Sequence, residues 1–471
     1  MTPAPRGRMT EEASGGAGYG LVRALSRLLL RLFYSRIELV GAENVPARGA
    51  LIVAANHHNS IVDAMLLLAL IPRRVRVLAN APLFRHFLIG PFLRALGALP
   101  VHRRQEAGSE APRNEALFEA TTAALVAGGA IAIFPEGRTQ PEPSLQELRT
   151  GTARMLLAAE DASPGLSVTL LPVGLVFDRP GTFRTGRALV WIGPPVPVDT
   201  GDAREGPPAS ARALTERLTV ALRAQIVEAD DRQTLRLLRL AEELWNEGDA
   251  EGELPPRGVR GEAERAAWLQ GAMRTYRSLA GIAPDRVAAF RRDLEAYDDA
   301  ARRAGVAAEQ LSRSYSVSSV VRFTLREGAS LLLGAPLALG GILVHGLPYL
   351  LTIVAVRLIP HTDEEEATDK IAAGLVLYPL AWLGEGWAVH RLGGGGALAV
   401  FLVALLPAGF FALAWHERLE SVGREARAFA RFLGDRDAPS RLRATRRALV
   451  TELRALVALA VVDASGMERT E

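Results

Sequence analysis

Residues 50–63 read A-L-I-V-A-A-N-H-H-N-S-I-V-D, an apolar run followed by a polar turn and a second apolar pattern. The run is typical of a buried β-strand, and Ser60 is a candidate N-cap for the helix that follows. Asp63 then lies in the first turn of that helix, where side chains point back towards the helix N-terminus. We therefore expect the Asp63 carboxylate to lie near the ring of His57 or His58.

A carboxylate that holds one imidazole nitrogen fixes the tautomer and leaves the other nitrogen free to accept a proton. This is a Ser-His-Asp arrangement without the serine, so the expected nucleophile is a substrate hydroxyl. Two other interpretations stay open on the residues alone. Asp63 and Ser60 could form a capping box beside exposed histidines, or the histidines could bind a metal, although no other histidine in the chain lies at ligand spacing from them.

Residues 131–139 read I-A-I-F-P-E-G-R-T, a second apolar strand that ends in a tight turn. Pro135 and Gly137 shape the turn, while Glu136 and Arg138 place polar groups where strand ends gather into a crevice. Arg138 with nearby backbone N–H groups is suited to cradle a phosphate. The plainer interpretation is an ordinary hairpin or strand–helix turn.

Two shorter stretches lie on either side of that turn in the sequence. Residues 97–104 read G-A-L-P-V-H-R-R and place Arg103 after a short apolar run, either as a second phosphate ligand or as a solvated arginine. Residues 170–175 read L-L-P-V-G-L, and Pro172 is expected to break a buried strand and to shape a pocket wall. Neither stretch indicates a function by itself.

Together and in this order, the four stretches resemble the motifs of the glycerolipid acyltransferase family, whose members acylate glycerol 3-phosphate or 1-acylglycerol 3-phosphate. That family has an Asn-His motif with an aspartate downstream, a motif ending in arginine, a Phe-Pro-Glu-Gly motif, and a motif with a proline before an apolar residue. The matching residues here are 56–63, 97–103, 134–139 and 171–173. The resemblance covers about residues 30–200 and implies an α/β acyltransferase domain.

The resemblance also implies a role for each site residue. A histidine removes the proton from a glycerol hydroxyl as the oxygen attacks an acyl thioester, and Asp63 orients that histidine. Coenzyme A or acyl carrier protein leaves, with no metal and no other cofactor required. Arg103, Glu136, Gly137 and Arg138 position the substrate, the two arginines by binding its phosphate and Glu136 by ordering the loop or a glycerol hydroxyl.

The base is either His57 or His58. The usual family spacing has four residues between the histidine and the aspartate, which selects His58. A branch that resembles the fungal glycerol-3-phosphate and dihydroxyacetone-phosphate acyltransferases has five, which selects His57, and F-R-T at 183–185 also resembles that branch. We therefore favour His57 and retain both as candidates.

These residues predict an O-acyltransferase of phospholipid biosynthesis whose partners are an acyl thioester, a membrane lipid, and a glycerol-phosphate or lysophospholipid acceptor. The acceptor stays open among glycerol 3-phosphate, dihydroxyacetone phosphate and 1-acylglycerol 3-phosphate. An alternative function is a transacylase that moves acyl chains between phospholipids and lysophospholipids with the same histidine and aspartate. A third is a membrane-anchored scaffold with an inactive domain.

Composition limits the remaining classes. Hydrophobic residues make up 49% of the chain, which excludes a wholly disordered protein. The chain has no cysteine, so disulfides, cysteine nucleophiles and thiolate metal sites are excluded. The balance of 55 basic and 52 acidic residues argues against a nucleic-acid-binding protein.

The pattern along the 471 residues predicts five segments. These are a disordered N-terminus over 1–18, an α/β acyltransferase domain over 19–200, a helical region over 211–320, membrane-embedded helices over 328–415, and a basic helical tail over 416–471. The α/β domain begins with an amphipathic helix in which Arg23, Arg27 and Arg31 lie on a different stripe from the leucines. Such a helix suits an anionic membrane surface or an ordinary surface position on a core.

Two long uncharged runs indicate an integral membrane protein. Residues 328–356 and 392–415 contain 29 and 24 residues without a formal charge, more than the roughly 20 needed to cross a bilayer. The uncharged piece between them, 371–384, has only 14 residues and is expected to be re-entrant or interfacial. Arginines before 328 and after 415 predict that both flanks, and with them the catalytic domain, lie on the cytoplasmic face, with two crossings.

Overall fold

The computed structural model describes the chain in segments: residues 8–85, 89–101, 111–139, 142–178, 183–184, 186–198, 207–248, 261–304, 317–358, 366–434 and 438–467. The chain divides into two compact units. The first contains residues 1–231 with 261–267 and 361–371, and the second contains 232–260, 268–360 and 372–471.

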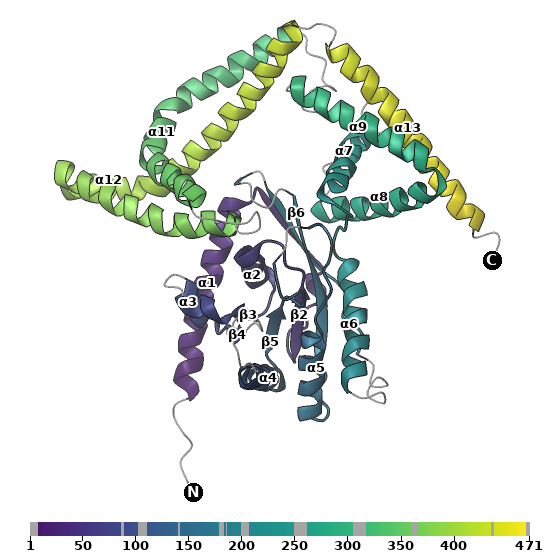
Figure 1. Cartoon of the computed structure of the whole chain (residues 1–471). Coiled ribbons are helices and arrows are strands. Elements are labelled where there is room, and N and C mark those ends of the chain that lie inside the picture. The colour runs from purple at the N-terminus through teal and green to yellow at the C-terminus, as the bar shows by residue number, and fades with distance from the viewer. Residues whose placement is uncertain are drawn as a thin grey trace. The chain divides into compact units, whose positions relative to one another are not determined.

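A seven-stranded sheet in the order β1-β7-β6-β2-β5-β3-β4 forms the centre of the first unit (Figure 1). Its strands are β1 (Arg36–Val40), β2 (Leu51–Ala55), β3 (Arg76–Asn80), β4 (Leu99–Val101), β5 (Ala130–Ile133), β6 (Thr169–Asp178) and β7 (Arg187–Ile192). Every pair is parallel except β6 with β7. A mostly parallel sheet needs helices on both faces, so its central strands are apolar throughout.

Strand β2 lies between β5 and β6, and all five of its residues are buried. Alternate side chains enter different cores. Val53 packs on the side of α1 (Arg8–Phe33) and α2 (Ser60–Leu70), and Ile52 packs on the side of α4 (Ala111–Val126), α5 (Gly151–Ala162) and α6 (Pro207–Arg223). Ala54 pairs with Ile133 of β5, the last residue of that strand. The polar turns that follow β2 and β5 therefore start side by side at the carboxyl edge of the sheet.

The helices of this unit are α1 (Arg8–Phe33), α2 (Ser60–Leu70), α3 (Ile89–Leu96), α4 (Ala111–Val126), α5 (Gly151–Ala162) and α6 (Pro207–Arg223). Short 3₁₀ turns, η1 (Ala42–Asn44) and η2 (Ala81–Arg85), follow β1 and β3. The predicted α/β domain followed by helices is confirmed by this architecture.

Helix α1 corrects the predicted disorder of residues 1–18, because it already begins at Arg8; residues 1–7 lie outside the described residues. Tyr19 and Val22 are buried in the core, and this packing offsets the low helix propensity of the glycines before them. The Tyr19 hydroxyl also accepts a hydrogen bond from the backbone N–H of Val75 at 3.0 Å.

Two of the arginines of α1 have a structural role that the helical pattern did not indicate. Arg23 donates to the carbonyl oxygen of Ile71 at 2.6 Å, and Arg27 donates to that of Ala69 at 2.8 Å. Both carbonyls lie at the C-terminus of α2, where unpaired oxygens and the helix dipole favour cations. The exposed leucines of the helix, Leu21 and Leu28, lie on another face.

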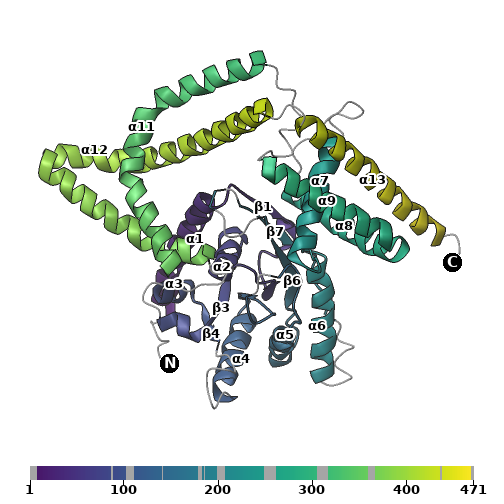
Figure 2. The same ribbon diagram turned by 45° about the horizontal axis from the view of Figure 1, so that its top comes forward.

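The second unit is helical. It contains α7 (Arg232–Gly248), α9 (Pro284–Ala304), α11 (Val317–Leu358) and α13 (Ala438–Met467), and most of α8 (Glu262–Ile282) and α12 (Glu366–Gly434). Helix α13 packs along α7 and α9, and both views show it beside α9 (Figures 1 and 2). Leu244, Leu294 and Leu449 form the core of this contact.

Two helical stretches, Leu325–Leu358 and Thr368–Gly423, are long and apolar enough to cross a membrane. Gly394, at φ 71° and ψ −168°, divides α12 into two arms. The piece 371–384 belongs to the first arm, which continues through Glu385 to this kink and is about 40 Å long at 1.5 Å per residue. The uncharged piece is therefore part of a longer helix, because Glu385 ends the uncharged run without ending the helix. Its re-entrant or interfacial placement stays a prediction.

Candidate active site

The turn after β2 is anchored to the neighbouring strand by Asn56, which is fully buried. Its Nδ2 donates to the carbonyl oxygen of Leu175 at 3.0 Å, and its Oδ1 accepts from the N–H of Leu175 at 2.6 Å. The amide thus continues the β2–β6 hydrogen bonding one residue past the end of β2. This pairing fixes where the next two residues, His57 and His58, leave the sheet.

Asp63 on α2 has no exposed surface, and its Oδ2 is the centre of the turn. The oxygen accepts hydrogen bonds from the backbone N–H groups of His58 at 2.8 Å and Asn59 at 2.7 Å. The same oxygen lies 2.8 Å from Nδ1 of His57. One carboxylate therefore shapes the loop and holds an imidazole ring.

The predicted N-cap is wrong by one residue. Asn59 is the N-cap of α2, and Ser60 is the first helical residue with φ 46°. Asp63 bonds the N–H of the N-cap residue, as the acid of a capping box does, but from one position further along the helix. Because Ser60 is already the first residue of the helix, it does not occupy the N-cap position.

The His57 ring is held on two sides. It stacks on Phe134, with ring centroids 4.0 Å apart and planes inclined by 12°. An ionised carboxylate only accepts, so the contact with Asp63 places the ring proton on Nδ1 and leaves the Nε2 lone pair free to accept a proton. The side chain keeps 14% of its surface exposed, and a proton acceptor needs such access.

Glu136 joins the two turns. Its Oε1 accepts from the backbone N–H of His57 at 2.8 Å, across 79 residues of sequence, and its Oε2 accepts from that of Gln146 at 3.2 Å. The side chain is 3% exposed, and burial raises its pKa against the opposing effect of the His57 and Gln146 hydrogen bonds and nearby histidine charge. Of its two predicted roles, this position fits ordering of the loop.

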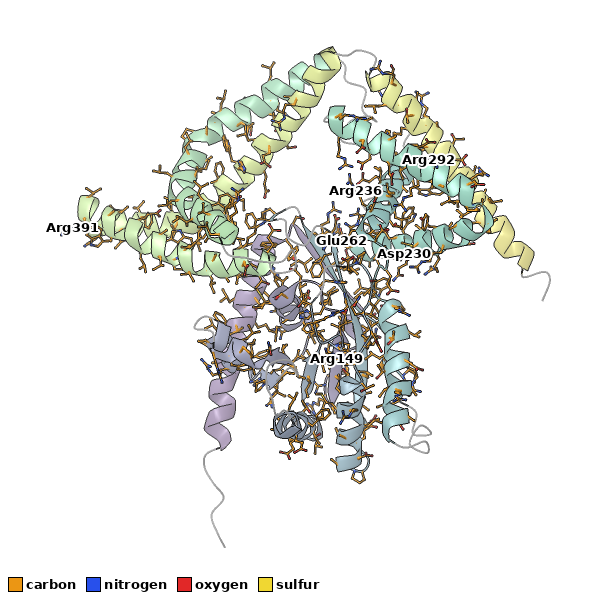
Figure 3. All side chains as sticks on the ribbon, in the orientation of Figure 1. Arg149, Asp230, Arg236, Glu262, Arg292 and Arg391 are labelled. Carbon is orange, nitrogen blue, oxygen red and sulfur yellow. The ribbon has the colours of Figure 1, made fainter. Side chains whose placement is uncertain are left out.

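The turn after β5 carries two exposed arginines. Arg138 donates from its guanidinium to Oε1 of Gln146 at 2.8 Å. Arg149, marked in Figure 3, donates its backbone N–H to the carbonyl of Pro135 at 2.9 Å. Its side chain lies over Gly137, where a Cβ would come within 2.9 Å of Arg149 Nε. Gly137 also has φ 70°, a backbone conformation that favours glycine, and a Cβ there would displace the Arg149 side chain.

Residues 36–176 match the family model described as Acyltransferase. A segment of 135 residues is 31% identical to glycerol-3-phosphate O-acyltransferase 2 of Saccharomyces cerevisiae, over 28% of this chain and 18% of that protein. Residues 36–176 form an acyltransferase domain. The family assignment from the four motifs is thereby confirmed.

Other relatives of the acyltransferase domain extend further along the chain. An uncharacterized acyltransferase of Schizosaccharomyces pombe is 23% identical over 316 residues, covering 48% of this chain and 47% of that one. The chain thus spans less than half the length of these curated relatives. The crystal structure of a 1-acyl-sn-glycerophosphate acyltransferase of Thermotoga maritima aligns with a TM-score of 0.33 and 18% identity, over 46% of this chain and 84% of that one.

The acyltransferase domain brings together His57, Asp63 and Glu136 through direct contacts, and Gly137 follows Glu136 in the same turn. His58 joins them through its backbone N–H, whereas Arg103 lies outside the described residues. No group of three or more His, Asp or Glu side chains suited to a metal occurs in the segments that the structure describes.

Arg149 is the residue that the sequence interpretation missed. It lies in L-R-T-G, 148–151, immediately before α5 and eleven positions after Arg138. The available signal was an arginine just ahead of a helix N-terminus, a position suited to anions. That signal is weak in an arginine-rich chain, and only the packing on Gly137 identifies this arginine.

Proposed function

We propose that the chain is an O-acyltransferase that moves a fatty acyl group from an acyl thioester to a hydroxyl of a glycerol phosphate or of its 1-acyl derivative. The observation that carries this proposal is the 2.8 Å contact between His57 Nδ1 and the buried Asp63 carboxylate beside the Phe-Pro-Glu-Gly turn. The contact supports His57, rather than His58, as the general base.

In the proposed mechanism, His57 Nε2 removes the proton from the acceptor hydroxyl as its oxygen attacks the thioester carbonyl. The new C–O bond forms, the C–S bond breaks, and the thiolate takes the proton from the imidazolium. Asp63 stabilises that imidazolium because its charge is buried and fixed. General-base catalysis of this kind contributes about 10² to 10⁴ in rate, and the remainder comes from positioning the reactants.

The acceptor phosphate is proposed to bind at the turn after β5. Arg138 and Arg149 are exposed there, and guanidinium groups form strong bidentate contacts with phosphate. Glu136 ties this turn to the backbone of His57, so a phosphate held by the arginines has a fixed position relative to the base. Arg103 stays a sequence-based candidate for the same phosphate.

Glycerol-3-phosphate O-acyltransferase 2 of Saccharomyces cerevisiae is named for its acceptor, and glycerol 3-phosphate is therefore the acceptor that we propose to test first. We further propose that the apolar helices hold the domain at the cytoplasmic face of a membrane, where acyl thioesters are available. Coenzyme A and acyl carrier protein are both candidate carriers.

The test uses membranes containing the full chain. Each acceptor, glycerol 3-phosphate, dihydroxyacetone phosphate and 1-acylglycerol 3-phosphate, is incubated with a labelled acyl thioester, with wild type and His57→Ala in parallel. Thioester-dependent product that is lost in the variant supports the proposal. Transfer from phospholipid donors without thioester would instead support the transacylase alternative. Equal product from wild type and the variant would overturn the proposal.

A further inference from the structure

The second unit contains a cavity of about 310 Å³ between α7, α8, α9 and α13. It lies between two small cores: Leu244, Leu294 and Leu449 pack on one side, and Leu279 and Leu456 pack on the other. Protein interiors are close-packed and leave few voids larger than a water molecule. This space is open on one side, so a ligand can enter it from solvent.

The volume fits a small apolar ligand. A cavity of about 150 Å³ lined by apolar side chains stays dry and binds benzene, and ligand pockets start at about 300 Å³. Aliphatic and aromatic side chains dominate the lining, among them Trp245, Trp268, Leu279 and Phe290. Water is a poor occupant of such a space, because each water needs two to four polar partners.

The charged group of the lining is paired. Arg291 is the single charged residue among the lining residues, and its Nε lies 3.1 Å from Oε1 of Glu295. The same carboxylate oxygen accepts from Nε2 of Gln233 at 2.8 Å. Hydrogen bonds with Glu295 and Tyr276 raise the pKa of Arg291 above its ordinary value, so the guanidinium stays charged and paired. Recognition by this cavity is therefore apolar, which excludes a nucleotide, a sugar or a metal ion.

We propose that this cavity binds the acyl chain of a single-chain amphiphile, whose polar head stays at the open side. Trp245, Trp268 and Phe290 are only half-buried, so the lining is accessible from one side. The choice of an acyl chain rests on the proposed function and on the apolar helices, since both place the chain among such molecules. A fatty acid, an acyl thioester and a lysophospholipid share this chemistry and differ in the head alone.

Helix α8 offers a matched pair of substitutions. Gly271 lines the cavity, and a Cβ there meets only the guanidinium end of Arg274, at 3.9 Å. Gly281 lies on the same helix, is exposed, and has nothing within 4 Å of its Cβ position. Leucine at 271 fills the cavity, whereas leucine at 281 makes the same chemical change in solvent. Ala272→Phe is a second filling variant, because Ala272 also lines the cavity.

The experiment uses the full chain in lipid nanodiscs and a palmitic acid that carries a photoreactive diazirine on its chain. After illumination, adducts are located by peptide mass spectrometry. We expect adducts on α8 and α9 that fall about tenfold in Gly271→Leu and Ala272→Phe and stay unchanged in Gly281→Leu. Adducts confined to α11 and α12, or labelling of α8 and α9 that both filling variants retain, would overturn the proposal.

Two further arms separate this proposal from the proposed function. His57→Ala is expected to lose acyl transfer and keep the labelling, because the probe carries no thioester and needs no turnover. Loss of labelling in that variant would contradict a binding site that is independent of the catalytic histidine. Unlabelled palmitate, 1-palmitoylglycerol 3-phosphate and palmitoyl-CoA then compete with the probe, and the strongest competitor identifies the head group. Failure of all three to compete would also overturn the proposal.

Discussion

Oδ2 of Asp63 lies 2.8 Å from Nδ1 of His57. The same oxygen accepts hydrogen bonds from the backbone N–H groups of His58 and Asn59. The ring and the loop therefore depend on one oxygen. A histidine held in this way has one defined tautomer before any substrate arrives. Substitutions at this position should accordingly affect catalysis and loop shape together.

His57→Ala is expected to lower kcat about 10²- to 10⁴-fold, because it removes the proposed general base. His58→Ala is the matched control: the ring of His57, and not that of His58, lies on Asp63, so we expect a change of less than about tenfold. Steady-state rates of thioester-dependent transfer measure both. A larger loss in the His58 variant would reverse the assignment of the base.

Glu136 predicts a pH dependence of stability. Burial raises its pKa above the ordinary value of 4.5, so the folded state holds the proton more tightly than the unfolded state. The free energy of unfolding of wild type, relative to Glu136→Gln, should therefore fall as the pH rises from about 4.5 through the raised pKa, and then stay constant. Thermal melts of both proteins between pH 4 and 8 measure the difference, and a relative stability that rises with pH would contradict it.

Arg138→Ala and Arg149→Ala should each raise the KM for the phosphate acceptor about 10- to 100-fold, the value of one charge-assisted contact, with a smaller effect on kcat. Arg154→Ala is the control, since that exposed arginine lies on α5 with its guanidinium 5.0 Å from the Phe118 ring centroid. Kinetics with varied acceptor at saturating thioester separate KM from kcat. Unchanged KM in both variants would remove the phosphate role.

Gly137→Ala and Gly128→Ala form a pair that separates backbone strain from a local clash. Both glycines have positive φ, 70° and 73°, so each substitution should cost about 1 kcal/mol of stability. At 128 the Cβ has open space, whereas at 137 it meets Arg149. We expect similar losses of Tm and a raised acceptor KM only in the 137 variant. An equal KM in the two variants would show that the position of Arg149 is unimportant.

Membrane integration has its own test. The apolar stretches 325–358 and 368–423 should keep the full chain in the membrane pellet after washing with high salt or alkaline carbonate, and only detergent should release it. The chain is followed by immunoblot beside a peripheral and an integral marker protein. Release by carbonate would contradict membrane-spanning helices.

The sequence predicts those features of the fold that depend on local pattern. The strand–turn–helix around 50–63 and the second turn at 131–139 occur where apolar runs end. The roles of Arg23 and Arg149 depend on Ile71 and Gly137, partners that local periodicity does not reveal. Long-range packing decides such partners, so the sequence could not place them.

The N-cap of α2 and the length of the first arm of α12 differ from the predictions made from the sequence. A serine ahead of an apolar run is a good cap by propensity, but Asp63 already satisfies the loop N–H groups, and Asn59 takes the position. The uncharged run 371–384 ends at Glu385 because that residue is acidic, whereas the helix continues beyond it. The segment predicted from the uncharged run is therefore shorter than the helix.

The hydrogen bond from the His57 backbone to Glu136 joins the turn after β2 to the turn after β5. A displacement of either turn is therefore transmitted to the other. In the proposed mechanism, this bond sets the spacing between the proton acceptor and the phosphate-binding arginines before a substrate arrives.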